Sequence, residues 1–370
     1  MERSLESFLD SERQLGQLDS SGTFTLDAHR SRLKLAQFQL AKRSYWVLKL
    51  VQAAVGSGAD QVEVTLGRDV DWVRFEPTLT CELDQLIAHL QQPEGRSGWL
   101  GDFATGVNAI LSQRPKTVLV GSPDWNLRLA DGHLQVFPGT SPMPGWTVAV
   151  RSRGGVMAWV AGDSRHRAEM AEAITTRCCY CPVPILLDQR VLMRGELNPD
   201  WGTHPRGRRG QELSRLFYLA QAHLGQANRL ARLRPTAAMP DGGIGVRHCD
   251  SLYFREATSD LCAFLAVPLG LRGPGRVDFV QSGVIVDRHH LDLGVEGAQV
   301  VVDGPGLSVD LSHFQLIENP AYQALVARLR EEVRLLVEVA SGHLDLLGQD
   351  SANLEKYVRF RLALLKEPEF

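Results

Sequence analysis

Lys49 is a charged residue within an otherwise apolar helical pattern, Val47-Leu-Lys-Leu-Val-Gln-Ala-Ala-Val-Gly56. The apolar residues follow the three-and-four spacing of a helix and predict a buried stripe, formed by Val47, Leu50, Val51 and Ala54. Lys49, Ala53 and Gly56 share the opposite face of this helix. An exposed lysine stays protonated near neutral pH. Lys49 could therefore pair with an anion such as phosphate, or it could simply be solvated.

A second segment that could bind an anion is Gly101-Asp-Phe-Ala-Thr-Gly-Val107, which leads into a helix predicted over about 103–113. Free backbone N–H groups at a helix N-terminus can hold a phosphate. Asp102 in the same segment would repel it. The pattern alone leaves both outcomes open.

Three of the six cysteines form the cluster Cys178-Cys-Tyr-Cys181. Neighbouring residues on a strand point to opposite faces, whereas a closed zinc site needs four converging ligands. We expect free thiols buried on a strand and predict no metal ligand.

The composition is typical of a soluble globular protein, with 370 residues, 44% apolar and 22% charged. A formal net charge of -3 gives no electrostatic reason to expect nucleic-acid binding. The first residues lack the apolar core of a signal peptide, and no apolar run approaches the roughly 20 residues of a membrane span. The sequence therefore predicts a cytoplasmic protein without a nucleic-acid or membrane partner.

Helical and strand patterns together predict an α+β protein. Alternating residues predict strands at 61–66, 70–75, 117–120, 127–129, 133–137, 146–150, 251–255, 262–267, 277–286 and 297–302. Helices are expected at 27–40, 81–90, 103–113, 165–176, 211–233, 322–337 and 351–366. A further helix, which contains Lys49, is expected to begin near Ser44 with this serine as its N-cap. The expected organisation is a flexible N-terminus (1–21), a first domain (22–155), a second domain (156–340) and a helical tail (341–370).

Four short segments, in order and spacing, resemble the nucleotide-binding motifs of the GHKL ATPases, which include gyrase, the ninety-kilodalton heat-shock chaperones, histidine kinases and MutL. The family's first helix reads Glu-Leu-x-x-Asn-x-x-Asp-Ala-Gly-Ala, and here Lys49, Ala53 and Gly56 stand for Glu, Asn and Asp. The family's Asp-x-Gly-x-Gly corresponds to Glu76-Pro-Thr-Leu-Thr80. Its phosphate loop corresponds to 101–107.

The remaining matches point to the chaperone branch. Thr147 stands where the family has a sheet threonine that contacts phosphate. Cys181-Pro-Val-Pro-Ile-Leu-Leu187 resembles the strand that opens the chaperones' middle domain, and Gly306–His313 resembles a later loop whose arginine reaches the terminal phosphate. The resemblance covers about 22–340, with the lid shortened to about 91–100 and no dimerising C-terminal domain. It implies a two-layer GHKL (Bergerat) α/β sandwich followed by a second α/β domain of the ribosomal S5 domain 2-like type.

The resemblance also implies that the catalytic groups are lost. In the family the helix glutamate orients the attacking water, the asparagine completes the magnesium shell, and the arginine contacts phosphate. Here these three positions hold Lys49, Ala53 and His313. We therefore predict no catalytic residue and no required cofactor, with ATP or ADP as the alternative. The vestigial pocket would be formed by Glu76, Gly101, Gly106, Thr147 and Lys49.

The leading hypothesis is a chaperone-like scaffold that does not hydrolyse ATP and acts through protein–protein contacts. Candidate contact elements are the basic loop His204–Arg209 and the tail helix with Tyr357 and Phe360, unless the arginines are only solvated and the aromatics pack internally. The alternative is a divergent ATPase in which Glu76 or Asp102 replaces the lost base. A DNA-handling protein of the gyrase or MutL type is a third hypothesis, which the mild acidity argues against.

Overall fold

The computed structural model describes residues 40–91, 98–130, 133–138, 145–152, 164–192, 218–224, 252–256, 261–268, 274–295 and 297–341. These residues form an α+β structure with two β-sheets and five α-helices. Several predicted features lie outside the described residues: the helix 27–40 except its last residue, the helix 351–366, the lid residues 92–97 and the basic loop.

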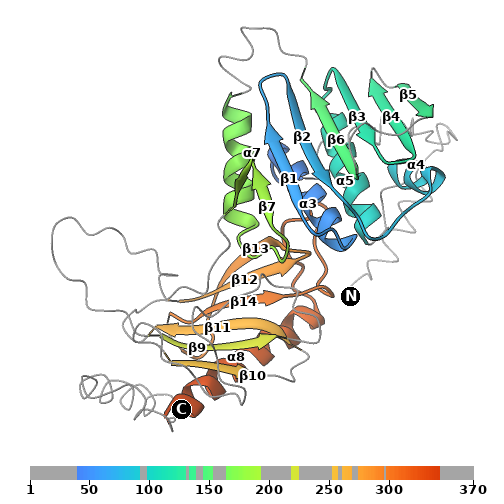
Figure 1. The fold of residues 1–370 in the computed structure, drawn as a ribbon. Coiled ribbons are helices and arrows are strands. Elements are labelled where there is room, and N and C mark those ends of the chain that lie inside the picture. Colours follow the sequence, from blue (N-terminus) through green and yellow to red (C-terminus); the bar gives the residue numbers. More distant parts are fainter. Residues whose placement is uncertain are drawn as a thin grey trace, which may run out of the picture. The chain divides into compact units, whose positions relative to one another are not determined.

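The first sheet has eight strands in the order β5-β4-β3-β6-β2-β1-β7-β8 (Figure 1). Neighbouring strands are antiparallel except β7, which pairs parallel with β1. The strands are β1 (Val62–Leu66), β2 (Val70–Phe75), β3 (Thr117–Gly121), β4 (Trp125–Ala130), β5 (His133–Pro138), β6 (Trp146–Arg151), β7 (Ile185–Leu187) and β8 (Arg190–Val191). The six strands predicted between residues 61 and 150 are confirmed. β7 and β8 join the same sheet although they lie beyond residue 155.

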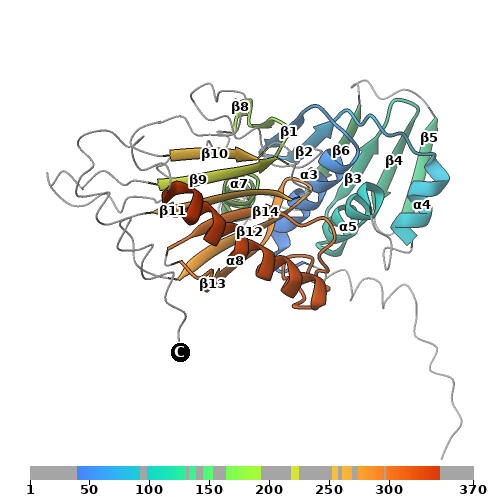
Figure 2. The same ribbon diagram turned by 90° about the horizontal axis from the view of Figure 1, so that it is seen from below.

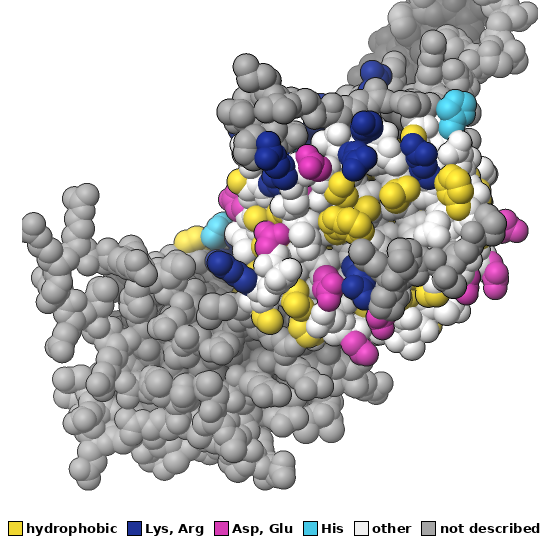
Figure 3. Space-filling view, turned by 45° about the horizontal axis from the view of Figure 1, so that its top comes forward, with side chains coloured by type: hydrophobic (Ala, Val, Ile, Leu, Met, Phe, Trp, Pro, Cys, Tyr) yellow, Lys and Arg dark blue, Asp and Glu magenta, His cyan; other side chains and the backbone are white. Residues whose placement is uncertain are grey.

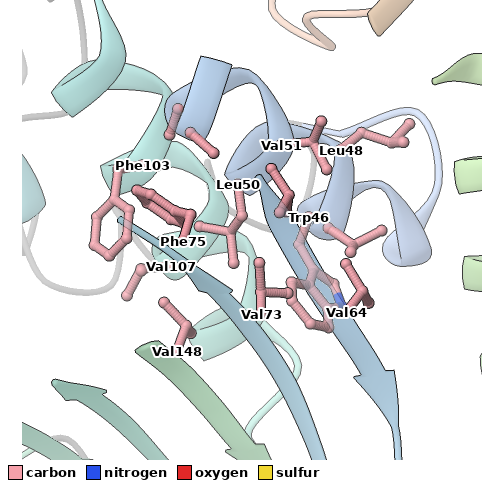
Figure 4. Packing of buried hydrophobic residues seen from close by; sticks show 14 of the residues in the cluster. Trp46, Leu48, Leu50, Val51, Val64, Val73, Phe75, Phe103, Val107 and Val148 are labelled. Carbon is pink, nitrogen blue, oxygen red and sulfur yellow. The ribbon is translucent and has the colours of Figure 1, made fainter. Parts of the chain in front are cut away.

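Helices cover one face of this sheet (Figures 1 and 2). They are α3 (Trp46–Gly56), which follows the short 3-10 turn η1 (Arg43–Tyr45), α4 (Leu83–Gln91) and α5 (Trp99–Ser112). Figure 4 shows how side chains of α3 and α5 pack on those of the strands, with Leu50 and Phe103 next to Phe75. All three are at most 2% exposed. The predicted apolar stripe of the first helix therefore belongs to the core.

The opposite face of the first sheet carries a different set of side chains. Leu119 pairs with Ala149, which pairs with Trp72, so the three side chains share this face. Leu119 is 47% exposed. Figure 3 shows hydrophobic side chains gathered on this side, with Lys and Arg side chains around them. The described helices α3, α4 and α5 leave this face uncovered.

The second sheet has six strands in the order β10-β9-β11-β14-β12-β13. They are β9 (Tyr218–Leu224), β10 (Leu252–Glu256), β11 (Cys262–Pro268), β12 (Gly275–Gln281), β13 (Val284–Leu291) and β14 (Gln299–Asp303). The long helix α8 (Pro320–Ser341) packs its apolar side, including Leu329, Val333 and Leu336, into the core of this sheet. The predicted amphipathic helix 322–337 is confirmed.

Two predictions in the second half are wrong. β9 lies inside the segment 211–233 that was predicted as a helix, because its pairing with β10 and β11 overrides the helix propensity of its leucine, alanine and glutamine residues. The predicted strand 277–286 is a hairpin instead. Ser282 and Gly283, with φ of 46° and 76°, form its two-residue turn.

Two local predictions also need correction. Ser44 does not cap the helix, because it lies inside η1, is buried, and Tyr45 is the N-cap. The cysteine cluster does not lie on a strand. It forms the turn after α7 (Ser164–Arg177), where Cys178 and Cys181 are buried and Cys179 is partly buried. The Cys181 N–H donates to the Cys178 carbonyl at 3.0 Å, and this local hydrogen bond closes the turn in place of a strand pairing.

Candidate functional site

The predicted nucleotide face of α3 packs directly against α5. Ala53 on this face is 0% exposed. A Cβ atom on Gly106 would lie 3.0 Å from Leu50 Cδ2 and 3.2 Å from the Trp46 carbonyl oxygen. A Cβ atom on Gly56 would lie 3.1 Å from Trp99 Cβ. Both glycines therefore permit close helix packing, and Ala53 and Gly106 do not line a solvent-filled crevice.

Lys49 is buried between these helices and is only 3% exposed. Its Nζ atom donates a hydrogen bond to Asp102 Oδ1 at 2.8 Å and lies 5.8 Å from the centre of the Phe314 ring. The interpretation of Lys49 as a solvated lysine is therefore wrong. Its charge is satisfied inside the protein by the carboxylate that follows Gly101.

Aromatic side chains fill the space between α5 and the sheet. The Trp146 ring, from β6, lies 5.0 Å from Phe103 and 5.3 Å from Trp99, both measured between ring centres. Trp125 and Phe75 also contact Trp146, at 5.5 and 6.4 Å. Trp146 is 4% exposed. Phe75, Phe103, Trp125 and Trp146 belong to the core, and Trp99 is partly buried against them.

Trp146 was not among the predicted site residues, and its neighbour Thr147 was. Successive residues of a strand point to opposite faces, so Thr147 points away from α5. It pairs with Gly121 and Arg74 on the uncovered face of the sheet. The alternation of residues 146–150 in the sequence was the signal that could have identified Trp146 as the residue facing α5.

The phosphate-loop segment is helical. α5 begins at Trp99 rather than at 103, and the Asp102 N–H donates to the Gly98 carbonyl at 3.1 Å. From Asp102 onward the N–H groups are thus engaged within the helix, and Gly106 lies in its middle. Gly101 is buried in the first turn. The segment 101–107 does not form an open cradle of free N–H groups.

Glu76 lies apart from this buried contact. It follows β2, its side chain is 67% exposed, and its carboxylate is 4.0 Å from Arg74 Nη2. A Cβ atom on Gly145 would lie 2.6 Å from Glu76 Cγ, and Gly145 has a φ of 77°, so this position requires glycine. The structure thus brings Lys49 and Gly106 together at the α3–α5 contact, buries Gly101 in the first turn of α5, and leaves Glu76 and Thr147 outside this contact.

The loop with His313 reaches the same part of α3. The Phe314 ring packs on Tyr45, with 4.8 Å between ring centres, and the Arg177 guanidinium lies 4.9 Å from the Tyr45 ring and 5.5 Å from the Phe314 ring. Arg177 Nη1 also donates to the Ile285 carbonyl at 2.7 Å. We call Tyr45, Arg177 and Phe314 the aromatic–arginine cluster. It joins η1, α7 and the 304–319 loop.

His313 has a φ of 57°, a conformation that histidine tolerates better than most residues. Burial, the largest cause, and the charge of Lys49 lower the pKa of His313 to about 4, against the partly opposing effect of Asp310. The imidazole is therefore neutral at pH 7. It does not replace the fixed positive charge of an arginine.

The second sheet holds another buried charge cluster. Asp278 is 1% exposed and accepts hydrogen bonds from two arginines. Arg276 Nε and Nη2 donate at 3.0 and 2.6 Å, and Arg288 Nε donates at 2.7 Å. Both arginine side chains stay partly exposed, at 39% and 43%. Burial, the largest cause, and the Asp278 charge raise the pKa of the nearby Cys179 thiol to about 11, so this thiol is not activated.

Within the part of the chain that the structure describes, no group of three or more His, Cys, Asp or Glu side chains is arranged to hold a metal ion. The helices of these residues also include none with the length and apolarity of a membrane span. Comparisons with protein-family models and with curated protein sequences find no match for this chain.

The chemistry available at the α3–α5 contact is limited. The Lys49 ammonium is neutralised by the Asp102 carboxylate. The same carboxylate is engaged with this ammonium and is not free to accept a proton from water. General base catalysis needs a free base within hydrogen-bonding reach of its substrate. The arrangement is suited to holding two helices together.

Proposed function

We propose that this chain is a GHKL-type protein that does not hydrolyse ATP and acts as a chaperone-like scaffold through protein–protein contacts. The proposal combines the resemblance of four motifs with the residues that replace the family's reactive groups. In this proposal, the second half of the chain is the counterpart of the chaperones' middle domain.

The observation that carries the proposal is the Lys49–Asp102 ion pair. It occupies the helix face that would have to receive the phosphates, and Ala53 and Gly106 beside it are buried. Opening this face would separate a buried ammonium from its carboxylate, which costs several kcal/mol. A nucleotide would have to supply this energy before it gained any contact.

A second observation favours a scaffold. The aromatic–arginine cluster and the hydrogen bond from Gln52 Nε2 to the Gln281 carbonyl, at 3.1 Å, link α3 to the second half without any ligand. The uncovered face of the first sheet offers exposed apolar surface at Leu119 and Phe137, 47% and 44% exposed. Such surface is typical of protein-binding sites.

Two measurements on the full-length protein test the loss of ATPase activity. Calorimetric titration with magnesium-ATP and with ADP should give no binding heat, and phosphate release should equal the buffer background. Tight binding with turnover would overturn the proposal. Glu76→Ala and Asp102→Asn would then show whether either carboxylate serves as the base of a divergent ATPase.

The scaffold role is tested by aggregation of a thermally unfolding client enzyme. The protein should suppress aggregation to the same extent with and without ATP. Leu119→Glu should weaken suppression, because it places a charge in the apolar surface of the uncovered face. Leu335→Glu, the same change at a 37% exposed leucine of α8, is the matched control. Equal activity of the two variants would exclude this face as the client site.

A further inference from the structure

β5 is the end strand of the first sheet. One of its sides pairs with β4 from His133 to Pro138, and no described strand pairs with the other side. In the described part of the chain, the backbone N–H and C=O groups on that side therefore have no strand partner, and a further strand could pair with them. The residues from His133 to Phe137 are all exposed.

This edge lacks the features that usually prevent strands from associating. Natural edge strands carry lysines, inward charges, internal prolines or bulges. His133-Leu-Gln-Val-Phe-Pro138 has no Asp, Glu, Lys or Arg, its only proline is the last residue, and its register with β4 is regular. The edge is therefore open and uncharged.

Exposed apolar surface is also concentrated here. Nine large hydrophobic residues of the described chain are exposed, and three of them, Leu134, Val136 and Phe137, lie on this one strand. They are 40%, 43% and 44% exposed. Leu134 and Val136 share one face of the sheet, and Phe137 lies on the other with His133 and Gln135, so each face of the edge carries exposed apolar surface.

We propose that β5 pairs antiparallel with β5 of a second copy of this chain, across a two-fold axis at Gln135. Residues whose numbers add to 270 then face each other. Leu134 faces Val136 of the second copy, and His133 faces its Phe137. The two eight-stranded sheets become one continuous sheet, with the described helices α3, α4 and α5 of both copies on the same side.

Self-pairing fits this strand better than an unrelated partner would, because the strand is complementary to itself. The two-fold register places apolar residues opposite each other on one face, which stabilises cross-strand pairs. It brings no like charges together because the strand carries none. The opposite edge of the sheet, β8, has only two residues and includes Arg190. It offers no comparable surface.

Light scattering after size-exclusion chromatography tests the proposal on the full-length protein. The wild type should have twice the mass of one chain, and Val136→Lys should give the single-chain mass with an unchanged circular dichroism spectrum. Val191→Lys is the matched control, since Val191 lies on the other edge strand and is 62% exposed. This variant should stay dimeric. A wild-type monomer at 100 µM would overturn the proposal, as would a dimer that Val136→Lys leaves intact.

A cross-link tests the register independently of folding effects. Directly opposed residues of antiparallel strands have Cα atoms about 4.5–5.5 Å apart, within the range of a disulfide. Gln135→Cys should therefore form a covalent dimer under mild oxidation, and Arg128→Cys on the neighbouring strand should not. Equal cross-linking of both variants, or none with Gln135→Cys, contradicts the two-fold register. Amide exchange protection of β5 in a monomer would show that another segment of the chain covers the edge.

Discussion

The helical layer on the first sheet and the second sheet each bury one charge, but they bury opposite partners of the ion pair. In the first, the Lys49 side chain is 4% exposed and its partner Asp102 is 26% exposed. In the second, the Asp278 side chain is 2% exposed and those of its partners Arg276 and Arg288 are 39% and 43% exposed. The buried group cannot be hydrated when its partner is lost, whereas the exposed partner can.

The two buried charges therefore have different structural roles. Asp278 holds the ends of two arginines that still reach water, so the cluster joins β12 to β13 and remains accessible. Lys49 has one carboxylate and one aromatic ring around its ammonium, so it depends on α5 and on the 304–319 loop at the same time. The Lys49–Asp102 pair therefore couples two parts of the chain, whereas the Asp278 cluster stiffens the β12–β13 hairpin.

The largest effect is expected from Lys49→Glu, which reverses the buried charge. It would place two carboxylates in a buried contact and should lower the free energy of unfolding by about 4 kcal/mol. Urea denaturation followed by circular dichroism measures this. Lys49→Met, which removes the charge but keeps the length, should cost much less. Equal losses for the two variants would show that charge is not what Lys49 contributes.

Removing the acid from each cluster compares them directly. Asp102→Ala should lower the free energy of unfolding by about 3 kcal/mol, because the Lys49 ammonium stays buried without its carboxylate. Asp278→Ala should cost less, since both arginines can turn toward water. The same urea experiment gives both values. The comparison fails if Asp278→Ala is the more damaging variant.

His313 predicts a pH effect confined to the first of these regions. Its folded pKa of about 4 lies below its ordinary value, so the unfolded chain takes up the proton first as the pH falls. Stability should therefore drop from about pH 6.5 toward pH 4, by about 2 kcal/mol at pH 5. His313→Asn keeps a side chain that tolerates positive φ and should remove the part of the pH dependence of stability that His313 causes. Urea denaturation of the wild type and of His313→Asn at pH 7.5 and pH 5 gives the free energy of unfolding of each protein. An identical pH dependence in both proteins would exclude His313 as its source.

The smallest effect concerns two glycines. Gly106→Ala should lower the free energy of unfolding by about 1 kcal/mol, because crowding against Leu50 outweighs the gain in helix propensity. Gly294→Ala, after β13, meets no atom within 4 Å and is opposed only by its φ of 76°. Thermal unfolding of both variants distinguishes packing from backbone strain. A stabilised Gly106→Ala protein would mean that α3 and α5 separate easily.

Period-two and helical patterns were sufficient to predict most elements, including the six antiparallel strands of the first sheet and α8. They failed at β9, where pairing with distant strands decided the structure of a segment rich in helix formers. They could not show that Lys49 is buried, because its partner Asp102 is 53 residues away, in a segment whose pattern indicates repulsion of phosphate or a substitute base and no ion pair. Thr147 was assigned from a motif, although strand alternation places Trp146 toward α5.

The parallel pairing of β7 with β1 has a consequence for synthesis. Val62 and Ile185 are direct partners, so β1 keeps an open edge until more than a hundred further residues have left the ribosome. Contacts this distant in sequence form slowly, and a nascent sheet with an open edge is prone to association. The hydrogen bond from Gln52 to the Gln281 carbonyl joins residues still further apart in the sequence, so it forms even later in synthesis. The N-terminal half of this chain is therefore expected to need protection from other nascent chains before its own sheet is complete.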